Sequence, residues 1–318
     1  MSEITHRTVD TNGIRMHIAE QGEGPLVLFI HGFPESWYSW RHQLPALAEA
    51  GYHAVAPDVR GYGRTDAPKA IEAYSMRNMT ADFAGLLDAL DAETAVVVGH
   101  DWGAPIAWHC ALLYPQRFRA VAGMSVPYTG RMPMLPTQLF KQIFADNFFY
   151  SLYFQEPGIA EAELEPDVRD FMRKFMYGAS GERPDEGGVL TPKKNTARLL
   201  DGMADMPALP SWLTQADLDY YVSEFERTGL SGGLNRYRNM DRDWEELAEL
   251  QGAKVQQPAL FIAGERDPVI RMAGVDAMKE HVPNLRGSVL FPGAGHWVQQ
   301  ERPAETNAKL IEFLGALP

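Results

Sequence analysis

Short unbroken runs of apolar residues mark the expected strands of this chain. Three of them stand out: Leu26–Ile30, Ala95–Val98 and Leu260–Ala263. Runs of this length that are rich in Val, Ile, Leu and Phe, and that do not alternate with polar residues, are typical of strands buried on both faces of a sheet. Weaker patterns predict three further strands, at Ala54–Ala56, 118–126 and 287–291.

Helical patterns separate these runs. After the first run, apolar residues recur at helical spacing from Trp37 to Leu47, and Gly51 follows as a stop signal. Ser75 is suited to cap the helix that precedes the second run, and Pro303 to begin the last helix. Strands that alternate with helices in this way predict an α/β fold, in which a mostly parallel sheet is covered by helices on both faces.

One long stretch interrupts the alternation. Residues 128–237 contain no buried-strand run, many Met, Phe and Tyr, and a Gly- and Pro-rich link at 178–192. We expect this stretch to form a helical cap domain and residues 1–127 and 238–318 to form the core domain. An inserted cap covers the cleft at the carboxyl ends of the strands, where parallel sheets bind their ligands.

Composition limits the partners and the compartment. Hydrophobic residues make up 45% of the 318 residues, and the net charge of −13 argues against nucleic acid or an anionic membrane surface as a partner. We find no apolar signal-peptide region at the N-terminus and no apolar run of membrane-spanning length. The single cysteine, Cys110, is expected to be a packed thiol and fits a reducing compartment. We therefore expect a soluble, cytoplasmic protein.

The sharpest chemical motif is Gly99-His100-Asp101-Trp102-Gly103, between a predicted strand and a predicted helix. A chain that turns at once from strand into helix holds the middle residue in a strained, exposed position. Small residues two places before and after it let the two backbones cross closely. This context is the nucleophile elbow of α/β-hydrolases, with Asp101 in place of the usual serine. An aspartate that only caps the helix is the alternative.

A carboxylate nucleophile restricts the substrate. Aspartate is normally ionised at neutral pH, so it needs no base to activate it. Its attack on a saturated carbon gives an ester, which water can cleave to restore the carboxylate, whereas a serine attacking the same carbon would leave an ether. Asp101 therefore favours epoxides or alkyl halides as substrates over acyl esters, and it excludes a serine-type esterase.

The second step needs a base, and two further residues supply one. His296 follows the predicted strand 287–291, and Asp267 follows the strand Leu260–Ala263. Both therefore lie at the same sheet edge as Asp101, where Asp267 can accept the ring N–H of His296 and fix its orientation. The chain order nucleophile, acid, histidine is that of α/β-hydrolases. Taken singly, Asp267 is equally consistent with a turn before Pro268.

The motif His31-Gly32-Phe33-Pro34 follows the first buried strand. In this fold that position forms an oxyanion hole, from the backbone N–H groups of Phe33 and Trp102. The hole would stabilise the tetrahedral intermediate of ester hydrolysis. A tight turn that needs Gly and Pro is a compatible structural explanation of the same motif.

With these motifs, HGFPESW at 31–37, DVRGYGRTD at 58–66 and GHDWGAPIAW at 99–108, the chain resembles the α/β-hydrolase-fold epoxide hydrolases over nearly its whole length. The resemblance implies an eight-stranded sheet, a helical cap, a cis peptide bond at Phe33-Pro34 and no cofactor or metal. YFQEPG at 153–158 and GGLNRYRN at 232–239 resemble the cap segments that carry the family's paired tyrosines. By this resemblance Tyr153 and Tyr237 are the ring-opening acids. Arg236 stands where family members often have Trp.

The implied substrate is a small, largely apolar epoxide, and the resemblance allows a homodimer. Two phenols suit an epoxide because they can polarise the ring oxygen and then protonate the alkoxide. A haloalkane dehalogenase shares the fold and the Asp nucleophile, but a halide leaving group needs N–H donors. Trp102 could supply one, whereas Phe33 has no side-chain N–H. Fluoroacetate dehalogenases carry Arg, not Trp102, after the nucleophile. A non-catalytic ligand-binding member of the fold is the alternative of another class.

Overall fold

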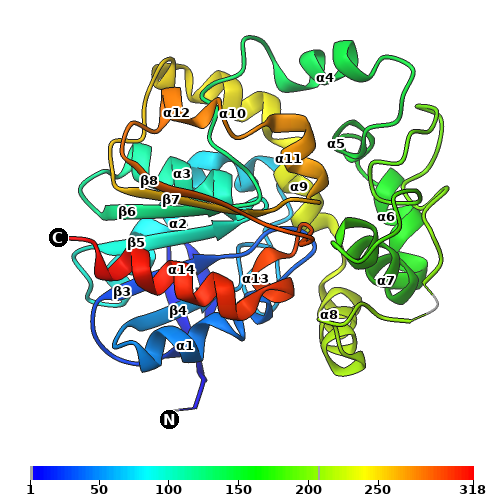
Figure 1. The fold of residues 1–318 in the computed structure, drawn as a ribbon. Helices are drawn as coiled ribbons and strands as arrows, with labels where there is room; N and C mark the ends of the chain where they lie inside the picture. Colours follow the sequence, from blue (N-terminus) through cyan, green and yellow to red (C-terminus); the bar gives the residue numbers. More distant parts are fainter. Residues whose placement is uncertain (1–2, 207) are drawn as a thin grey trace.

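The centre of the molecule is an eight-stranded sheet with the order β1-β2-β4-β3-β5-β6-β7-β8 (Figure 1). The computed structural model describes residues 3–206 and 208–318. β1 pairs antiparallel with β2 and β2 with β4, while the strands from β4 to β8 pair parallel. This confirms the predicted α/β-hydrolase fold class. In chain order the strands span Thr5–Thr11, Ile14–Gln21, Leu26–Ile30, His53–Pro57, Ala95–His100, Phe118–Met124, Ala259–Gly264 and Leu285–Phe291.

The last six strands in the chain, β3 to β8, are those that the apolar runs predict, and β1 and β2 are additional. β1 has mostly exposed residues and forms a hairpin with β2. Asn12 and Gly13 connect the two strands, both with positive φ (43° and 76°), which is typical of the tight turn that fits strand twist. β6 ends at Met124, two residues before the predicted end, because Ser125 adopts a φ of 66°.

Helices cover both faces of the parallel strands. α1 (Gln43–Glu49) packs against α14 (Pro303–Gly315) on one face, and α2 (Met76–Ala89) packs against α3 (Gly103–Leu113) on the other. Ser75 caps α2 and Pro303 begins α14, as predicted. Cys110 is a buried thiol on α3, also as predicted. Short helices complete the core: η1 (Trp37–Trp40), η2 (Ile71–Tyr74), η4 (Ala248–Leu250), α11 (Pro268–Ala273), α12 (Met278–His281) and α13 (Val298–Glu301).

Between β6 and β7 the described residues form helices and loops, with one isolated bridge, Asn147–Lys194. Helices α4 to α8 lie to one side of the sheet (Figure 1). The predicted cap boundary at residue 237 falls inside α9, so the division at 128–237 stays a prediction. The helices of this stretch are α4 (Pro136–Phe144), α5 (Tyr150–Tyr153), α6 (Ile159–Leu164), η3 (Glu165–Asp167), α7 (Val168–Ala179), α8 (Gln215–Thr228), α9 (Ser231–Arg238) and α10 (Met240–Glu246).

None of the helices within residues 3–206 and 208–318 combines the length and the apolarity that crossing a membrane requires.

Candidate active site

Asp101 lies at the sharp turn between β5 and α3, with a φ of 51°. Non-glycine residues rarely adopt this region, and strain of this kind persists only where the surroundings enforce it. The enforcing contacts are backbone crossings on both sides of the turn. A Cβ on Gly99 would collide with the carbonyl of Gly103, and a Cβ on Gly103 would collide with the carbonyl of Ile30. Gly99 therefore lets β5 and α3 cross closely, and Gly103 lets the start of α3 approach β3, so that the turn presents Asp101 above the sheet.

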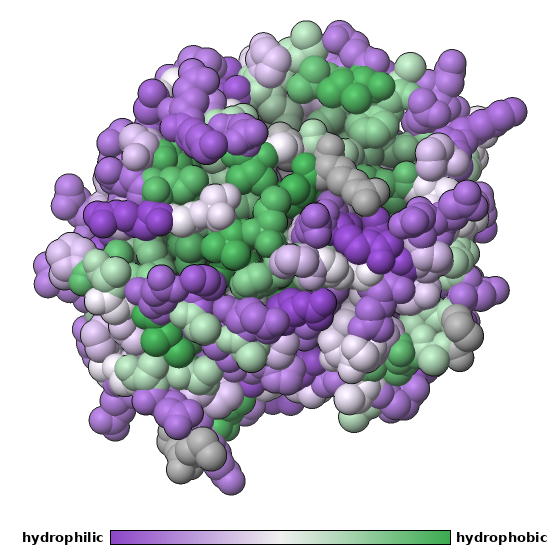
Figure 2. Space-filling view, in the orientation of Figure 1, coloured by the Kyte–Doolittle hydropathy of each residue, from purple (hydrophilic) through white to green (hydrophobic). Residues whose placement is uncertain are grey.

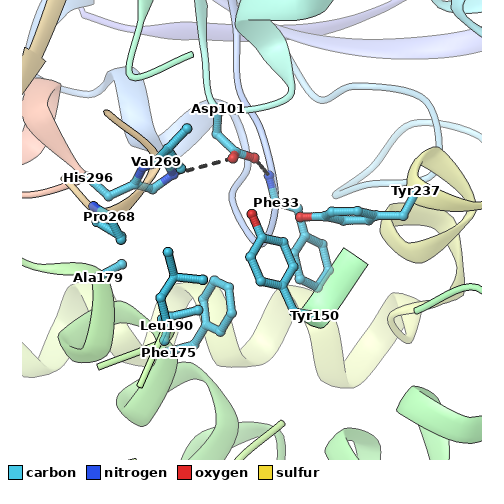
Figure 3. Close-up of a pocket in the computed structure, with 11 residues that line it drawn as sticks. Phe33, Asp101, Tyr150, Phe175, Ala179, Leu190, Tyr237, Pro268, Val269 and His296 are labelled. Carbon is cyan, nitrogen blue, oxygen red and sulfur yellow. Dashed lines mark hydrogen bonds and ion pairs between the residues drawn. The ribbon is translucent and has the colours of Figure 1, made fainter. Parts of the chain in front are cut away.

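Each carboxylate oxygen of Asp101 has its own partner (Figure 3). The backbone N–H of Phe33 donates to Oδ1 at 2.8 Å, and Nε2 of His296 lies 3.3 Å from Oδ2. The side chain of Asp101 is only 14% exposed. One oxygen is thus held by a backbone donor at the predicted oxyanion position, while the other faces the histidine. Trp102 follows at the N-terminus of α3, and the donor role of its N–H stays a prediction.

His296 lies between two carboxylates. Its Nδ1 is 3.1 Å from both oxygens of Asp267, which is completely buried after β7. Burial disfavours the charged ring, but the negative charges of Asp267 and Asp101 outweigh it and raise the pKa of His296 well above its usual value. The structure therefore brings together Asp101, Asp267 and His296 from three separate strand ends, in the arrangement that the sequence predicts.

Two tyrosines of the cap, Tyr150 and Tyr237, face Asp101. Both side chains line the cavity beside the carboxylate, and Figure 3 shows their hydroxyls pointing toward one another below it. Burial, reinforced by the charge of Asp101, raises the pKa of both phenols above the usual value. Both groups consequently keep their protons at neutral pH and can act as donors.

Tyr153 does not take the place that the sequence prediction gives it. It lies one helical turn after Tyr150, at the end of α5, and its hydroxyl donates to Glu163 at 2.6 Å. The same carboxylate accepts the backbone N–H groups of Leu199 and Leu200. Among the described residues, those that line the cavities at Asp101 include Tyr150 but not Tyr153. The assignment of Tyr153 is therefore corrected, because its hydroxyl joins α5 to Glu163 on α6 instead of facing Asp101.

Two cavities meet at Asp101, Tyr150, Tyr237 and Val269. The narrow cavity, of about 20 Å³, lies beside His296 and has room for about one water molecule. Its apolar walls are Phe33, Phe175, Ala179, Val189, Leu190 and Pro268. The wide cavity, of about 750 Å³, extends from Trp102 between α3, α4 and α10. Phe33 and Trp102, the predicted substrate contacts, thus face the narrow and the wide cavity respectively.

Comparison with known proteins identifies the family. Residues 25–303 match the family model described as alpha/beta hydrolase fold. The chain is 50% identical to Epoxide hydrolase A of Mycobacterium tuberculosis, over 100% of this chain and 99% of that protein. It is 41% identical to Bifunctional epoxide hydrolase 2 of Sus scrofa, over 95% of this chain and 53% of that protein.

Comparison with solved structures identifies the same family. An epoxide hydrolase from an endophytic Streptomyces superposes with a TM-score of 0.95 at 52% identity, covering 100% of this chain and 97% of that chain. Epoxide Hydrolase A from Mycobacterium thermoresistibile gives a TM-score of 0.94 at 51% identity, with 99% of both chains covered. The chain belongs to the epoxide hydrolases of the α/β-hydrolase fold. These relatives favour epoxide hydrolysis over dehalogenation and over ligand binding without turnover.

The triad of this epoxide hydrolase rests on a second buried pair, Glu35 and His100, which the sequence analysis missed. Nδ1 of His100 lies 2.7 Å from Glu35, and its Nε2 lies 2.7 Å from the backbone carbonyl of His296. Both ring nitrogens thus lie within hydrogen-bond distance of an oxygen atom. Burial raises the pKa of Glu35, but the charge of His100 and its hydrogen bond prevail and hold that pKa at about 2. The sequence did contain a signal for this pair, since Glu35 and His100 are ionisable residues inside the two motifs that contain Phe33 and Asp101.

The epoxide hydrolase carries Arg236 directly before Tyr237. Its buried guanidinium donates to the carbonyl of Tyr74, pairs with Asp243 and lies 5.0 Å from the ring centroid of Trp102. Burial lowers the pKa of Arg236 to about 9. Arg236 is not among the described residues that line either cavity. It therefore acts behind the cavity wall, where it ties α9 to the core.

The Phe33-Pro34 bond of this epoxide hydrolase is cis, as the resemblance implies. Among its described residues, no group of three or more His, Cys, Asp and Glu side chains is placed to hold a metal ion.

Proposed function

We propose that this epoxide hydrolase opens its substrate by attack of Asp101 on a ring carbon, followed by hydrolysis of the resulting ester. One observation carries this proposal, the surroundings of the Asp101 carboxylate. One of its oxygens accepts a backbone N–H, the other faces the triad histidine, and two protonated phenols line the same cavity. Oδ1 is occupied by the N–H of Phe33, so Oδ2 is the attacking atom. The products are a vicinal diol and the restored carboxylate.

Tyr150 and Tyr237 act on the ring oxygen. As the C–O bond of the epoxide breaks, the oxygen becomes an alkoxide that needs a proton or a strong hydrogen bond. Two phenols with raised pKa values remain protonated until that moment and hold the oxygen away from Asp101. We place Tyr150 in the role first predicted for Tyr153, and Tyr237 in the role predicted for it.

The charge of His296 changes with the reaction. In the free enzyme, Asp101 helps to raise the pKa of His296, which favours the imidazolium. Ester formation removes the negative charge of Asp101, so the pKa of His296 falls and the neutral ring, which can take a proton from water, is favoured more than in the free enzyme. Asp267 remains charged and orients the ring. The histidine thus becomes more available as a base when an ester exists for water to cleave.

Hydrolysis proceeds at the carbonyl carbon of the ester. His296 takes a proton from water, the hydroxide adds to Cγ of Asp101, and negative charge develops on Oδ1. The N–H of Phe33 already donates to this oxygen, and the N–H of Trp102 is proposed as the second donor. The tetrahedral intermediate then breaks its Cγ–Oδ2 bond, so Oδ2 leaves with the product and receives the proton from His296, while the water oxygen stays in the carboxyl group of Asp101. The second proton of the water leaves the restored Asp101 carboxyl group for His296. The proton that His296 gave up when the ester formed replaces the one that a tyrosine gave to the alkoxide, so one water is consumed per epoxide.

Replacement of His296 tests the scheme. His296→Gln should form the ester once and then stall, so mass spectrometry of the intact protein should show an increase equal to the mass of one substrate molecule. His53→Gln is the matched control, because His53 lies away from the site and bonds Glu20. Full turnover by His296→Gln would contradict the proposed base, and a stalled variant without added mass would contradict the covalent ester.

The largely apolar walls of both cavities support an apolar epoxide as substrate. We further propose the cytoplasm as the compartment, in keeping with a single buried thiol, and a homodimer as the assembly. Cell fractionation tests the first, and light scattering of the purified protein tests the second. Detection in the exported fraction, or a monomeric mass, would contradict the respective proposal.

A further inference from the structure

The two cavities at Asp101 differ greatly in size. The narrow cavity offers about 20 Å³ and the wide cavity about 750 Å³. An epoxide held between Asp101 and the two phenols can therefore extend a large substituent in one direction only. The wide cavity also opens at an apolar rim: Met132, Ile143 and Met272 all line it and are 37%, 61% and 44% exposed. Figure 2 shows the hydrophobic surface over α4. A long apolar chain fits this shape.

Among the described residues that line the wide cavity, one has a permanently cationic side chain, Arg131. The guanidinium of Arg131 lies 3.7 Å from the ring centroid of Trp244 and donates to the Trp244 carbonyl at 2.7 Å and to Gln251 at 2.9 Å. Its Nε is buried and has no hydrogen-bond partner in the structure. None of the carboxylates in the described part of the chain forms an ion pair with Arg131. The aromatic ring fixes the guanidinium, yet its charge is not neutralised.

The carboxylates on the same cavity wall do not supply the missing partner. Among the described lining residues they belong to Asp101, the nucleophile, and Asp243. Asp243 pairs with Arg236 through one oxygen and accepts the backbone N–H of Met76 through the other. Both oxygens of Asp243 therefore already have partners within the cavity wall. An anion that enters the wide cavity meets Arg131 as the unneutralised cation.

The spacing separates this cation from the reaction centre. Arg131 stacks on Trp244, which follows Tyr237 by seven residues along α9 and α10. Seven residues at the helical rise of about 1.5 Å per residue correspond to a path of roughly 10 Å along the two helices, which Asn239 separates. A ligand that spans both therefore needs an extended chain between its epoxide and its anionic group.

We propose that Arg131 binds the anionic end group of an elongated substrate whose chain fills the wide cavity and whose epoxide lies at Asp101. The substrate class is an unsymmetrically substituted epoxide, with a small or absent substituent on one ring carbon and a long apolar chain ending in a carboxylate on the other. This inference rests on the proposed function for its catalytic half, whereas the anion site can be measured without turnover.

Binding of undecanoate, which has the chain and the carboxylate but no epoxide, tests the site by calorimetry. Arg131→Gln should weaken its affinity at least tenfold, the usual effect of losing a hydrogen-bonded charge partner. Arg131→Lys should recover part of the loss. Arg169→Gln is the matched control, since Arg169 pairs with Asp219 on the surface, and it should leave the affinity unchanged. Equal affinity in wild type and Arg131→Gln would overturn the proposal, whatever the activity of either protein.

Turnover gives a second measurement. The terminal epoxide of undecanoic acid should lose at least tenfold in kcat/KM in Arg131→Gln, mainly through KM, while its methyl ester and epoxybutane should change less than twofold. The short substrate also reports whether the variant is folded and active. An equal loss for the acid and the ester would overturn the anion site. If the wild-type protein did not hydrolyse epoxybutane, the proposed catalytic function would be contradicted instead. The calorimetric result alone would then decide whether Arg131 binds the anion.

Discussion

His296 lies between two carboxylates that differ in one respect. The Asp267 side chain stays charged throughout the proposed reaction, whereas Asp101 loses its charge when the ester forms. The pKa of His296 is raised well above its usual value although burial acts against it, because both negative charges favour the imidazolium. The same residue can therefore be charged in the free enzyme and neutral in the ester.

Asp101→Asn reproduces the uncharged side chain without a substrate. The pKa of His296 should fall in this variant, since one of its two negative neighbours is removed while burial remains. Nuclear magnetic resonance of the ring nitrogens, followed across pH, measures it. Asp66→Asn, at an exposed ion pair with Arg15, is the control that should leave the His296 titration in place. An unchanged or higher pKa in Asp101→Asn would contradict the proposed change of charge.

The tyrosines give a second prediction at this scale. Tyr150→Phe and Tyr237→Phe should each slow ester formation about tenfold, and the double variant should lose on the order of 10² to 10⁴, the range of general acid catalysis. Tyr153→Phe should keep the wild-type rate and lose about 1 kcal/mol of stability with the Glu163 hydrogen bond. Rapid-quench single turnovers and urea unfolding provide the two measurements. A Tyr153→Phe rate as low as that of Tyr150→Phe would restore the original assignment.

The sequence could predict that cap tyrosines face the nucleophile, but not which one on α5. Tyr150 and Tyr153 are one turn apart and lie in the same aromatic stretch. Only the position of Glu163, brought to Tyr153 by the packing of α6, separates their roles. Tertiary contacts of this kind leave no trace in local spacing.

At the scale of elements, the turn from β5 to α3 positions the nucleophile. It combines the φ of 51° at Asp101 with two backbone crossings that exclude a Cβ. The sequence predicts this element well because its requirements are local: a buried strand, a small residue on each side and a helix. The β1–β2 hairpin has an equally local signal in Asn12-Gly13. The apolar runs do not reveal it, because β1 is mostly exposed.

Gly99→Ala should destabilise the fold by about 3 kcal/mol or more, because the added methyl meets the Gly103 carbonyl and neither backbone can move without breaking the turn. Gly315→Ala is the control. It lies in α14 with open space around its Cα, so an added methyl should be neutral or stabilise by up to about 1 kcal/mol. Chemical unfolding of both variants checks this. A Gly99→Ala variant as stable as the wild type would contradict the close crossing of β5 and α3.

At the scale of the whole molecule, the reaction needs both the sheet and its insertion. The sheet supplies Asp101, Asp267 and His296 from strand ends, and the residues between β6 and β7 supply Tyr150 and Tyr237. The parallel sheet and its three strand-end residues follow from patterns in the sequence. The unequal cavities do not, since their walls come from helices distant in the chain, and their shapes depend on side-chain packing.

A single turnover in water enriched in heavy oxygen tests the central claim, that Asp101 forms an ester which water cleaves at Cγ. With enzyme in excess over an epoxide, the label should enter the Asp101 side chain, and the first diol formed should carry none. Mass spectrometry of the peptide that contains Asp101 and of the diol measures both. Label in the first diol with an unlabelled Asp101 would mean that water attacks the epoxide directly, and it would contradict the covalent mechanism.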